Sequence, residues 1–292
     1  MKRLFVTGAS GFLGWNICNA NQKEWEIFGT VNSHPIVIAG TNTVQIDLTD
    51  FKELKRVFKE IRPHAVIHAA AASNPDFCQE NPAESQRINV DASVNIAGLC
   101  ADRKIPLAFT STDLVFDGLN APYREEDPVS PVNVYGEQKV LAEERIFKTY
   151  PPAAVCRMPL MFGNPGPAAS SFFQSMINAL KEGRELRLFA DEFRTPISGK
   201  TAVQGLFLAL NKINGLIHLG GAERISRYNF GLLLMESLGI SEAALIKCQQ
   251  KDIITAAHRP PDVSLDSSNA FAAGFKPLPL RGELKSLLEP GA

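Results

Sequence analysis

The amino-acid sequence predicts an α/β fold with a doubly wound parallel sheet, followed by a smaller and less regular α/β region. Over residues 1–160, short apolar runs alternate with segments of helical periodicity, and a glycine-rich turn follows the first run. Strand–helix alternation of this kind predicts parallel strands joined by right-handed crossovers. The runs are apolar throughout, which is typical of strands covered by helices on both faces.

The individual elements follow from periodicity and from helix start and stop signals. The predicted helix over 51–61 repeats apolar residues at helical spacing, with Asp50 as its expected N-cap and Pro63 just beyond its end. The run 216–219 is expected to return one strand to the main sheet. Further strands are predicted at 4–7, 25–31, 44–46, 65–68, 106–110 and 153–157, and helices at 12–22, 82–103, 134–150, 168–183 and 226–238.

Composition and charge exclude several classes of protein. With 292 residues, 45% of them hydrophobic and 21% charged, the chain is long enough to bury a sizeable core. The 30 basic and 31 acidic residues balance without a basic run, so we expect neither a nucleic-acid nor a membrane partner. The five cysteines have no paired spacing, which favours reduced thiols and a cytoplasmic protein. No cluster of His, Cys and acidic residues has ligand spacing, so no metal site is expected.

Three glycines mark the turn between the first strand and the first helix. Gly8 permits the tight turn, Gly11 lets the backbone approach a pyrophosphate, and Gly14 lets helix and strand pack closely. The free N–H groups at the helix start favour the phosphate charge. A purely structural turn is the alternative, but a turn at the first strand of an alternating pattern favours a dinucleotide site in a Rossmann-type domain. The same turn adds Ser10, Phe12 and Leu13 to the predicted cofactor-binding residues.

The domain organisation follows from the same pattern. Residues 1–160 are expected to form the NAD(P)-binding domain, completed by about 198–220. Residues 161–197 and 221–292 are expected to form a discontinuous substrate-binding region, because the sequence becomes irregular and rich in Gly and Pro after residue 160.

The end of the second strand reports the choice of cofactor, because an acid there binds the ribose 2′-hydroxyl. From 27 to 46 the chain has no Asp or Glu, and Asn32, Ser33 and His34 occupy the place instead. The missing carboxylate permits a 2′-phosphate, so NADP is the preferred prediction and NAD the alternative. These three residues are candidate hydrogen-bond donors, although an ordinary polar turn before Pro35 would look the same.

A tyrosine and a lysine lie one turn apart at the start of a predicted helix. Tyr135 and Lys139 share a face, and an ammonium beside a phenol draws the pKa of the phenol toward neutrality. An isolated pair could be two exposed helix residues. Upstream, however, Ser111, Thr112 and Asp113 place hydroxyls at the carboxyl end of a parallel strand, where open α/β sheets bind ligands. The combination predicts an active site.

These motifs resemble the extended short-chain dehydrogenases, in the order TGxxGxxG, Ser/Thr and YxxxK. The resemblance implies a catalytic set of Thr112, Tyr135 and Lys139, with Ser111 as the alternative to Thr112, and a structural role in the active site for Asn89. It also implies an adenine contact at Asp47 and Leu48 and further cofactor contacts at Ala69, Ala70 and Ala71.

Within that family the chain looks most similar to the dTDP-4-dehydrorhamnose reductases. The segments 111–118 and 191–197 and the pair Arg259-Pro260 carry this resemblance. It implies NAD(P)H-dependent reduction of the C4 ketone of a nucleotide-linked 4-keto-deoxysugar. Tyr135 would donate the proton, Lys139 would hold the nicotinamide ribose, and Thr112 would contact the reacting oxygen. The implied substrate-binding residues are Ser111, Asp113, Leu160 and Arg259, the last directed at a pyrophosphate.

Two departures and three alternatives limit this prediction. Leu114 stands where these reductases usually have Tyr, and Leu160 stands where an aromatic residue stacks on the base. A dehydratase is disfavoured because it needs a proton-transferring Glu at the position of Leu114. A sugar-nucleotide 4-epimerase and a non-catalytic regulatory subunit, like that of methionine adenosyltransferase, stay as alternatives. A homodimer is expected from the family alone.

Overall fold

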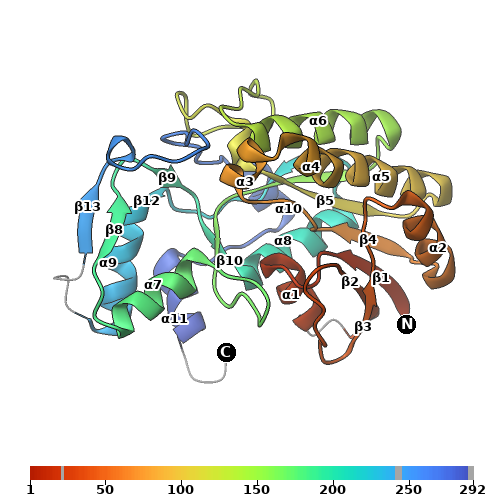
Figure 1. The fold of residues 1–292 in the computed structure, drawn as a ribbon, viewed down its shortest axis with the longest axis horizontal. Helices are drawn as coiled ribbons and strands as arrows, with labels where there is room; N and C mark the ends of the chain where they lie inside the picture. The colour runs from red at the N-terminus through yellow and green to blue at the C-terminus, as the bar shows by residue number, and fades with distance from the viewer. Residues whose placement is uncertain (21–22, 241–244, 289–292) are drawn as a thin grey trace.

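The computed structural model describes residues 1–20, 23–240 and 245–288, and a parallel sheet forms its centre (Figure 1). Within the described residues this sheet has seven strands in the order β11-β6-β5-β4-β1-β2-β3, and every neighbouring pair is parallel. The doubly wound parallel sheet predicted from the sequence is confirmed. The strands are β1 (Lys2–Thr7), β2 (Trp25–Val31), β3 (Thr41–Gln45), β4 (Ala65–His68), β5 (Leu107–Thr112), β6 (Ala154–Met158) and β11 (Gly215–His218).

Two layers of helices cover the sheet. Along β1, Leu4 and Val6 enter one apolar cluster and Phe5 enters the other, so successive side chains fill the cores on opposite faces. Asp50 caps α2 as predicted, accepting hydrogen bonds from the backbone N–H groups of Lys52 and Glu53. One face carries α2 (Phe51–Ile61), α5 (Ala92–Arg103) and α6 (Val134–Thr149), and the other carries α1 (Phe12–Asn19) and α8 (Gly199–Lys212) (Figure 1).

The helical stretch predicted over 82–103 is helical throughout, but a π-helical turn divides it and a further short helix precedes it. The chain forms α3 (Pro75–Glu80) and α4 (Pro82–Gln86), then one π-helical turn at Arg87–Asp91, and then α5. Asn74 caps α3 through its side-chain oxygen, with Pro75 at the first helical position. This is an ordinary helix-start signal. The π turn widens the helix at Asn89, a residue of the predicted site, and such turns are frequent at functional sites.

Smaller differences occur at the ends of elements. The third strand begins at Thr41, three residues before the prediction, because Thr41, Asn42 and Thr43 pair with Ile27, Phe28 and Gly29 of β2 despite their polarity. The predicted helix over 12–22 ends at Asn19, and residues 21–22 lie outside the described part. The strand expected at 216–219 is β11, which pairs with β6 at the edge of the main sheet.

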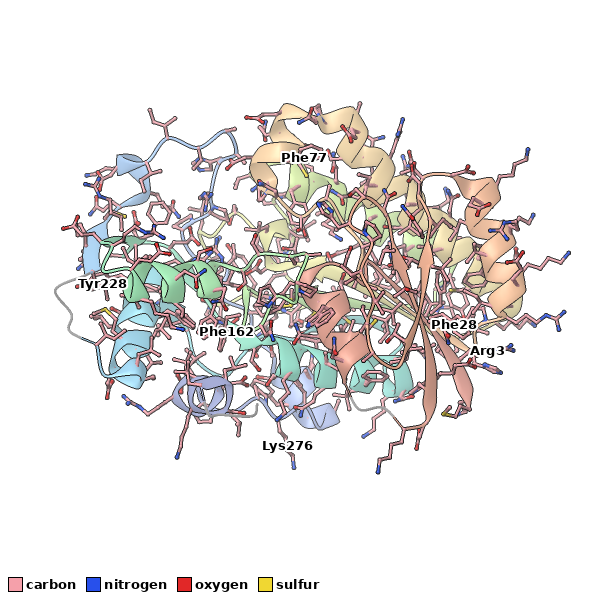
Figure 2. All side chains as sticks on the ribbon, turned by 60° about the horizontal axis from the view of Figure 1, so that its bottom comes forward. Arg3, Phe28, Phe77, Phe162, Tyr228 and Lys276 are labelled. Atoms are coloured by element: carbon pink, nitrogen blue, oxygen red, sulfur yellow. The ribbon has the colours of Figure 1, made fainter. Side chains whose placement is uncertain are left out.

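The C-terminal region packs beside the end of the sheet around a core of its own. Phe162, Phe173 and Phe230 meet there, with ring centroids 5.1–6.5 Å apart. Figure 2 shows Phe162 between the sheet domain and this region, and Tyr228 at the far end. The apolar stripes predicted at 168–183 and 226–238 are therefore core, as expected. The region contains α7 (Phe172–Lys181), α9 (Arg227–Leu238) and α11 (Leu280–Leu288), with the short strands β7 (Met161–Phe162), β8 (Leu186–Phe189), β9 (Phe193–Arg194), β10 (Ile197–Ser198), β12 (Ile225–Ser226) and β13 (Leu245–Cys248). The helix α10 (Ser268–Ala273) instead packs against β11 and α8 of the sheet domain.

The order of the strands places a crevice at the carboxyl end of β1. The chain moves from β1 to β2 on one side and to β4 on the other, and open α/β sheets bind ligands at such a reversal. In the part of the chain that the structure describes, no helix is long and apolar enough to cross a membrane. The same described residues hold no group of three or more metal-ligating side chains.

Candidate active site

A first cavity of about 360 Å³ opens at the crevice beside β1. Most of the predicted cofactor-binding residues line it, although they come from five separate stretches of the chain. The tertiary fold thus brings together the glycine turn, the end of β2, the loop after β3, the end of β4 and the start of α6. The predicted residues that line this cavity are Gly8, Ser10, Gly11, Phe12, Leu13, Gly14, Asn32, Asp47, Leu48, Ala69, Ala70, Ala71, Tyr135 and Lys139.

The glycines of the turn are required by geometry. Gly8 has a φ of +73°, and a Cβ there would lie 2.8 Å from the Cα of Ala70. A Cβ on Gly14 would lie 2.0 Å from the carbonyl oxygen of Gly8, so α1 packs on the turn only without a side chain. A Cβ on Gly11 would lie 3.3 Å from the same oxygen. The turn therefore keeps backbone N–H groups open at the start of α1, which fits a dinucleotide pyrophosphate.

The predicted 2′-phosphate residues divide between the cavity and its outside. Asn32 lines the cavity, whereas Ser33 and His34 are exposed and do not line it. The Ser33 hydroxyl and the Nδ1 of His34 lie 3.1 Å apart. Asp47 lines the cavity and accepts hydrogen bonds from the backbone N–H and the hydroxyl of Thr49, both at 2.8 Å. Asp47 is thereby oriented by its own loop.

Tyr135 and Lys139 are both buried at the start of α6. Lys139 donates a hydrogen bond from Nζ to the carbonyl oxygen of Thr110 at 2.8 Å, and its Nζ lies 5.9 Å from the Tyr135 ring centroid. Burial lowers the pKa of Lys139 to about 8, while the nearby Glu143 acts in the opposite direction. The lysine is therefore held in place by the end of β5 rather than by the tyrosine.

The pKa of Tyr135 differs from the expectation. Burial raises it above its usual value, the Asp113 carboxylate adds to the rise, and the Thr112 hydroxyl acts against both. The expected lowering by Lys139 is wrong: burial dominates the shift, because removing the phenolate from water is costly, and the Lys139 ammonium is 5.9 Å from the ring centroid. Tyr135 is consequently protonated at neutral pH, which suits a proton donor.

Ser111 and Thr112 have different partners. The Ser111 hydroxyl donates to the buried carboxylate of Glu143, which Arg157 binds with two hydrogen bonds of 3.1 and 2.8 Å. The Thr112 hydroxyl donates to Asp113 at 3.2 Å and accepts from the backbone N–H of Leu114, and it lies close enough to the Tyr135 phenol to lower the pKa of that phenol. Thr112 is therefore the hydroxyl that is free to turn toward a ligand beside Tyr135.

Asn89 lies behind the cavity. Its side-chain oxygen accepts from the N–H of Ala72 at 2.8 Å, and its amide donates to the carbonyl of Ala72 and to Gln138. Asn89 thus joins the loop after β4 to α6. It positions Ala72, which lines the first cavity, without lining that cavity itself.

A second cavity of about 550 Å³ continues from the first toward the C-terminal region. Tyr135 and Ser111 line both cavities, so the phenol stands where they meet. All four predicted substrate residues, Ser111, Asp113, Leu160 and Arg259, line the second cavity together with Thr112.

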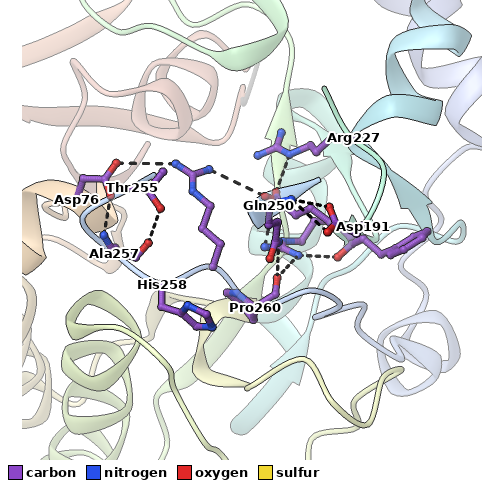
Figure 3. A network of polar contacts seen from close by, with 12 residues as sticks. Asp76, Asp191, Arg227, Gln250, Thr255, Ala257, His258 and Pro260 are labelled. Atoms are coloured by element: carbon purple, nitrogen blue, oxygen red, sulfur yellow. Dashed lines mark hydrogen bonds and ion pairs between the residues drawn. The ribbon is translucent and has the colours of Figure 1, made fainter. Parts of the chain in front are cut away.

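Sequence reasoning missed four charged residues of the second cavity, namely Asp76, Glu192, Arg194 and Arg227. The segment 191–197 carried part of the family resemblance, but no signal in the sequence indicated that it would face Arg227 and Arg259. Glu192 accepts a hydrogen bond from Nε of Arg227 at 2.8 Å. Arg259 lies between Asp76 and Glu192, 3.8 and 4.0 Å from their carboxylates, and bridges the two parts of the molecule (Figure 3).

Comparison with protein families assigns the chain. The family model described as RmlD substrate binding domain matches residues 1–292. The chain belongs to this family. The protein named "Probable low-salt glycan biosynthesis reductase Agl14" from Haloferax volcanii is 30% identical to this chain over 271 residues. The match covers 91% of this chain and 90% of that protein. Methionine adenosyltransferase 2 subunit beta from Bos taurus is 27% identical over 298 residues, covering 99% and 88%.

Solved structures of the family share the whole fold. A hypothetical dTDP-4-dehydrorhamnose reductase from Sulfolobus tokodaii is 31% identical, has a TM-score of 0.84 and covers 97% of this chain and 99% of its own. A dTDP-4-dehydrorhamnose reductase from Bacillus anthracis, solved in complex with NADP, is 22% identical with a TM-score of 0.86 and coverage of 98% and 99%. The resemblance that the sequence indicated is confirmed.

Proposed function

We propose that the protein is an NAD(P)H-dependent oxidoreductase of the extended short-chain dehydrogenase type, which reduces the C4 ketone of a nucleotide-linked 4-keto-deoxysugar. One observation carries the proposal: a protonated Tyr135 stands at the junction of the cavity beside the glycine turn and a second cavity lined by charged side chains. Thr112 and Lys139 flank it. A ketone placed at this junction would lie within reach of the phenol from one side and of the cofactor from the other.

The residues of the chain act on the oxygen of that ketone. Tyr135 gives its phenolic proton to the oxygen as the carbonyl carbon becomes an alcohol carbon, and it recovers a proton from solvent afterwards. Thr112 turns its hydroxyl from Asp113 to the same oxygen. Lys139, held by the Thr110 carbonyl, lies over the cofactor side of the site. When bound, reduced NAD(P) supplies the hydride. General acid help of this kind is worth about 10²–10⁴-fold.

NADP is the preferred cofactor in this proposal. The end of β2 presents Asn32 to the cavity, and no carboxylate stands from 27 to 46 to repel a 2′-phosphate. Ser33 and His34 lie next to Asn32 on the exposed side and are the further donors proposed for that phosphate. NAD remains the alternative, since Asn32 can also bond a ribose hydroxyl.

The nucleotide end of the substrate is proposed to lie toward the arginines of the second cavity. Arg259 is the most exposed of the three and has no hydrogen-bonded carboxylate among the described residues, so it is available to a diphosphate. Leu160 lines the cavity without a ring to stack on a base, and Phe12, Tyr135 and Phe172 are the aromatic residues that share this lining. The base is therefore left open in the proposal.

The decisive experiment measures oxidation of NADPH and NADH with a panel of nucleoside-diphosphate 4-keto-sugars. We expect NADPH oxidation with at least one member, and Tyr135→Phe should reduce kcat by about 10²–10⁴-fold without changing the Kd of NADPH. Unchanged turnover in Tyr135→Phe would refute the role of the phenol. Interconversion of sugar nucleotides by protein with tightly bound NAD, without net oxidation, would replace the reductase with an epimerase.

A cofactor-binding regulatory subunit is the second candidate, and the 27% identity to methionine adenosyltransferase 2 subunit beta over nearly the whole chain favours it. This reading predicts NADPH binding without turnover on any keto-sugar. The domain division at 1–160, 161–197, 198–220 and 221–292, a cytoplasmic location and a homodimer also remain proposals. Light scattering of the purified protein tests the homodimer.

A further inference from the structure

Two buried carboxylate oxygens in the second cavity have no hydrogen-bond partner among the described residues. They are Oδ2 of Asp113 and Oε2 of Glu192, and the two residues are only 4% and 2% exposed. Both residues line the cavity. Leaving a buried acceptor unsatisfied costs free energy, and such groups are rare in native structures. These two oxygens are therefore open to hydrogen-bond donors from a molecule that enters the cavity.

The arginine between the two acids cannot satisfy them. Nη1 of Arg194 donates to the carbonyl oxygen of Phe193 at 2.7 Å and points toward the carbonyl of Pro260 at 3.4 Å. This anchoring leaves its Nε 3.6 Å from Asp113 and its Nη2 3.7 Å from Glu192, too far for good hydrogen bonds. Arg194 thus compensates the charge of both carboxylates while their second oxygens stay free.

The charges around the pair favour a neutral donor over a cation. Asp76, Asp113 and Glu192 face Arg194, Arg227 and Arg259, so the acids are balanced by an equal number of guanidinium groups. A metal ion or an ammonium group would enter beside three fixed positive charges. A hydroxyl group is uncharged, so the arginines do not repel it, and one hydroxyl can donate a hydrogen bond to each free carboxylate oxygen.

We propose that Asp113 and Glu192 form a subsite for two neighbouring ring hydroxyls of the sugar, and that Glu192 is a specificity-determining residue. The inference rests on the proposed function for its orientation. Asp113 adjoins Thr112, beside the reacting C4 ketone, and so takes the hydroxyl on C3. Glu192 lies farther along, bonded to Arg227 on the nucleotide side, and so takes the hydroxyl on C2.

The experiment compares a thymidine-diphosphate 6-deoxy-4-keto-hexose with its 2-deoxy counterpart. A hydrogen bond to a charged, buried group sets the expected preference of the natural protein for the 2-hydroxyl at about 10- to 100-fold in kcat/KM. Glu192→Asp keeps the negative charge beside Arg227, but its side chain is one methylene shorter, so the free carboxylate oxygen moves away from the sugar hydroxyl. We expect it to reduce kcat/KM for the hydroxylated sugar and to leave the 2-deoxy sugar nearly unchanged. Glu192→Gln should act in the same direction.

Glu236→Gln is the matched control, because Glu236, like Glu192, is bound by an arginine but lies on the surface, where it accepts two hydrogen bonds from Arg281. It should leave both substrates unchanged. A purely structural role for Glu192 would lower kcat/KM for both sugars equally, and that result would overturn the inference while the reductase proposal stands. Equal use of both sugars by the natural protein would overturn it as well.

A binding measurement separates the inference from the activity. NADP⁺-loaded protein is titrated by calorimetry with the 4-hydroxy nucleotide sugar and with its 2-deoxy form. Tighter binding of the hydroxylated sugar, lost in Glu192→Asp, would support the subsite even if no keto-sugar is turned over, and would then refute only the reductase. Binding without any preference, or no binding of either sugar, would overturn the subsite.

Discussion

Gly136 lies between Tyr135 and Lys139, the two residues of α6 that we propose to be catalytic, and its replacement by alanine tests how the proposed active site is assembled. A Cβ at this position would lie 2.2 Å from the carbonyl oxygen of Leu114 and 2.9 Å from the Cβ of Pro131. The first contact is about 1 Å shorter than an ordinary one, so either the turn after β5 or the start of α6 must move. That movement separates Thr112 from Tyr135.

Two magnitudes follow for Gly136→Ala. Overpacking of this kind costs about 1–3 kcal/mol of the free energy of unfolding. A displacement of about 1 Å among reacting groups costs about 10²-fold in rate. We therefore expect a lower Tm and a kcat reduced by about 10²-fold. The Kd of NADPH should stay nearly constant, because the glycine turn and the end of β2, which line the first cavity, do not contact the position of the added Cβ.

Gly98 in α5 provides the matched control. The nearest atom to a Cβ there is Cγ2 of Thr149 at 3.9 Å, an ordinary contact. Gly98→Ala should stabilise the protein by about 0.5–1 kcal/mol, because alanine loses less backbone entropy in a helix. Thermal unfolding and steady-state NADPH oxidation measure both variants. An active and stable Gly136→Ala protein would refute the argument that α6 packs on the Leu114 carbonyl.

Three further predictions concern stability, pH and cofactor choice. Removing one partner of the buried Glu143–Arg157 pair, as in Glu143→Gln, should cost about 3–5 kcal/mol in urea unfolding; the double change to Leu and Met should recover much of it. In cofactor-free protein the pKa of Lys139 is about 8 against 10.5 for the free side chain, so the unfolded state binds more protons between these values. Lys139 therefore contributes a free energy of unfolding that rises with pH across that window, whereas the buried thiols, with raised pKa values, contribute in the opposite direction. The difference in unfolding free energy between the natural protein and Lys139→Met isolates the lysine, and a difference that does not change with pH would contradict its lowered pKa. Asn32→Asp should shift the ratio of kcat/KM values from NADPH toward NADH by at least about 10-fold, and an unchanged ratio would remove Asn32 from the cofactor argument.

The sequence by itself determined the sheet and the glycine turn of the proposed cofactor site. The need for Gly8, Gly11 and Gly14 arises within one short turn, and the alternation of apolar runs is also a local pattern. The glycine turn and the strands could therefore both be predicted from the sequence. The same holds for Asp50 as a helix cap. The break at Arg87–Asp91 was missed, because a π turn changes helical periodicity by only one residue and leaves the apolar pattern intact.

Only the tertiary structure decided the substrate side. Asp76, Glu192 and Arg227 are separated by up to about half the chain, and nothing in their local sequence indicates that they share a cavity. The pKa of Tyr135 was likewise decided by the tertiary structure. Its spacing to Lys139 predicted a lowered pKa, whereas burial raises it. Local patterns determine backbone conformation, whereas burial and charge pairing depend on which distant segments meet. That is why the cofactor turn could be predicted from its own residues, and the two unpaired acids of the second cavity could not.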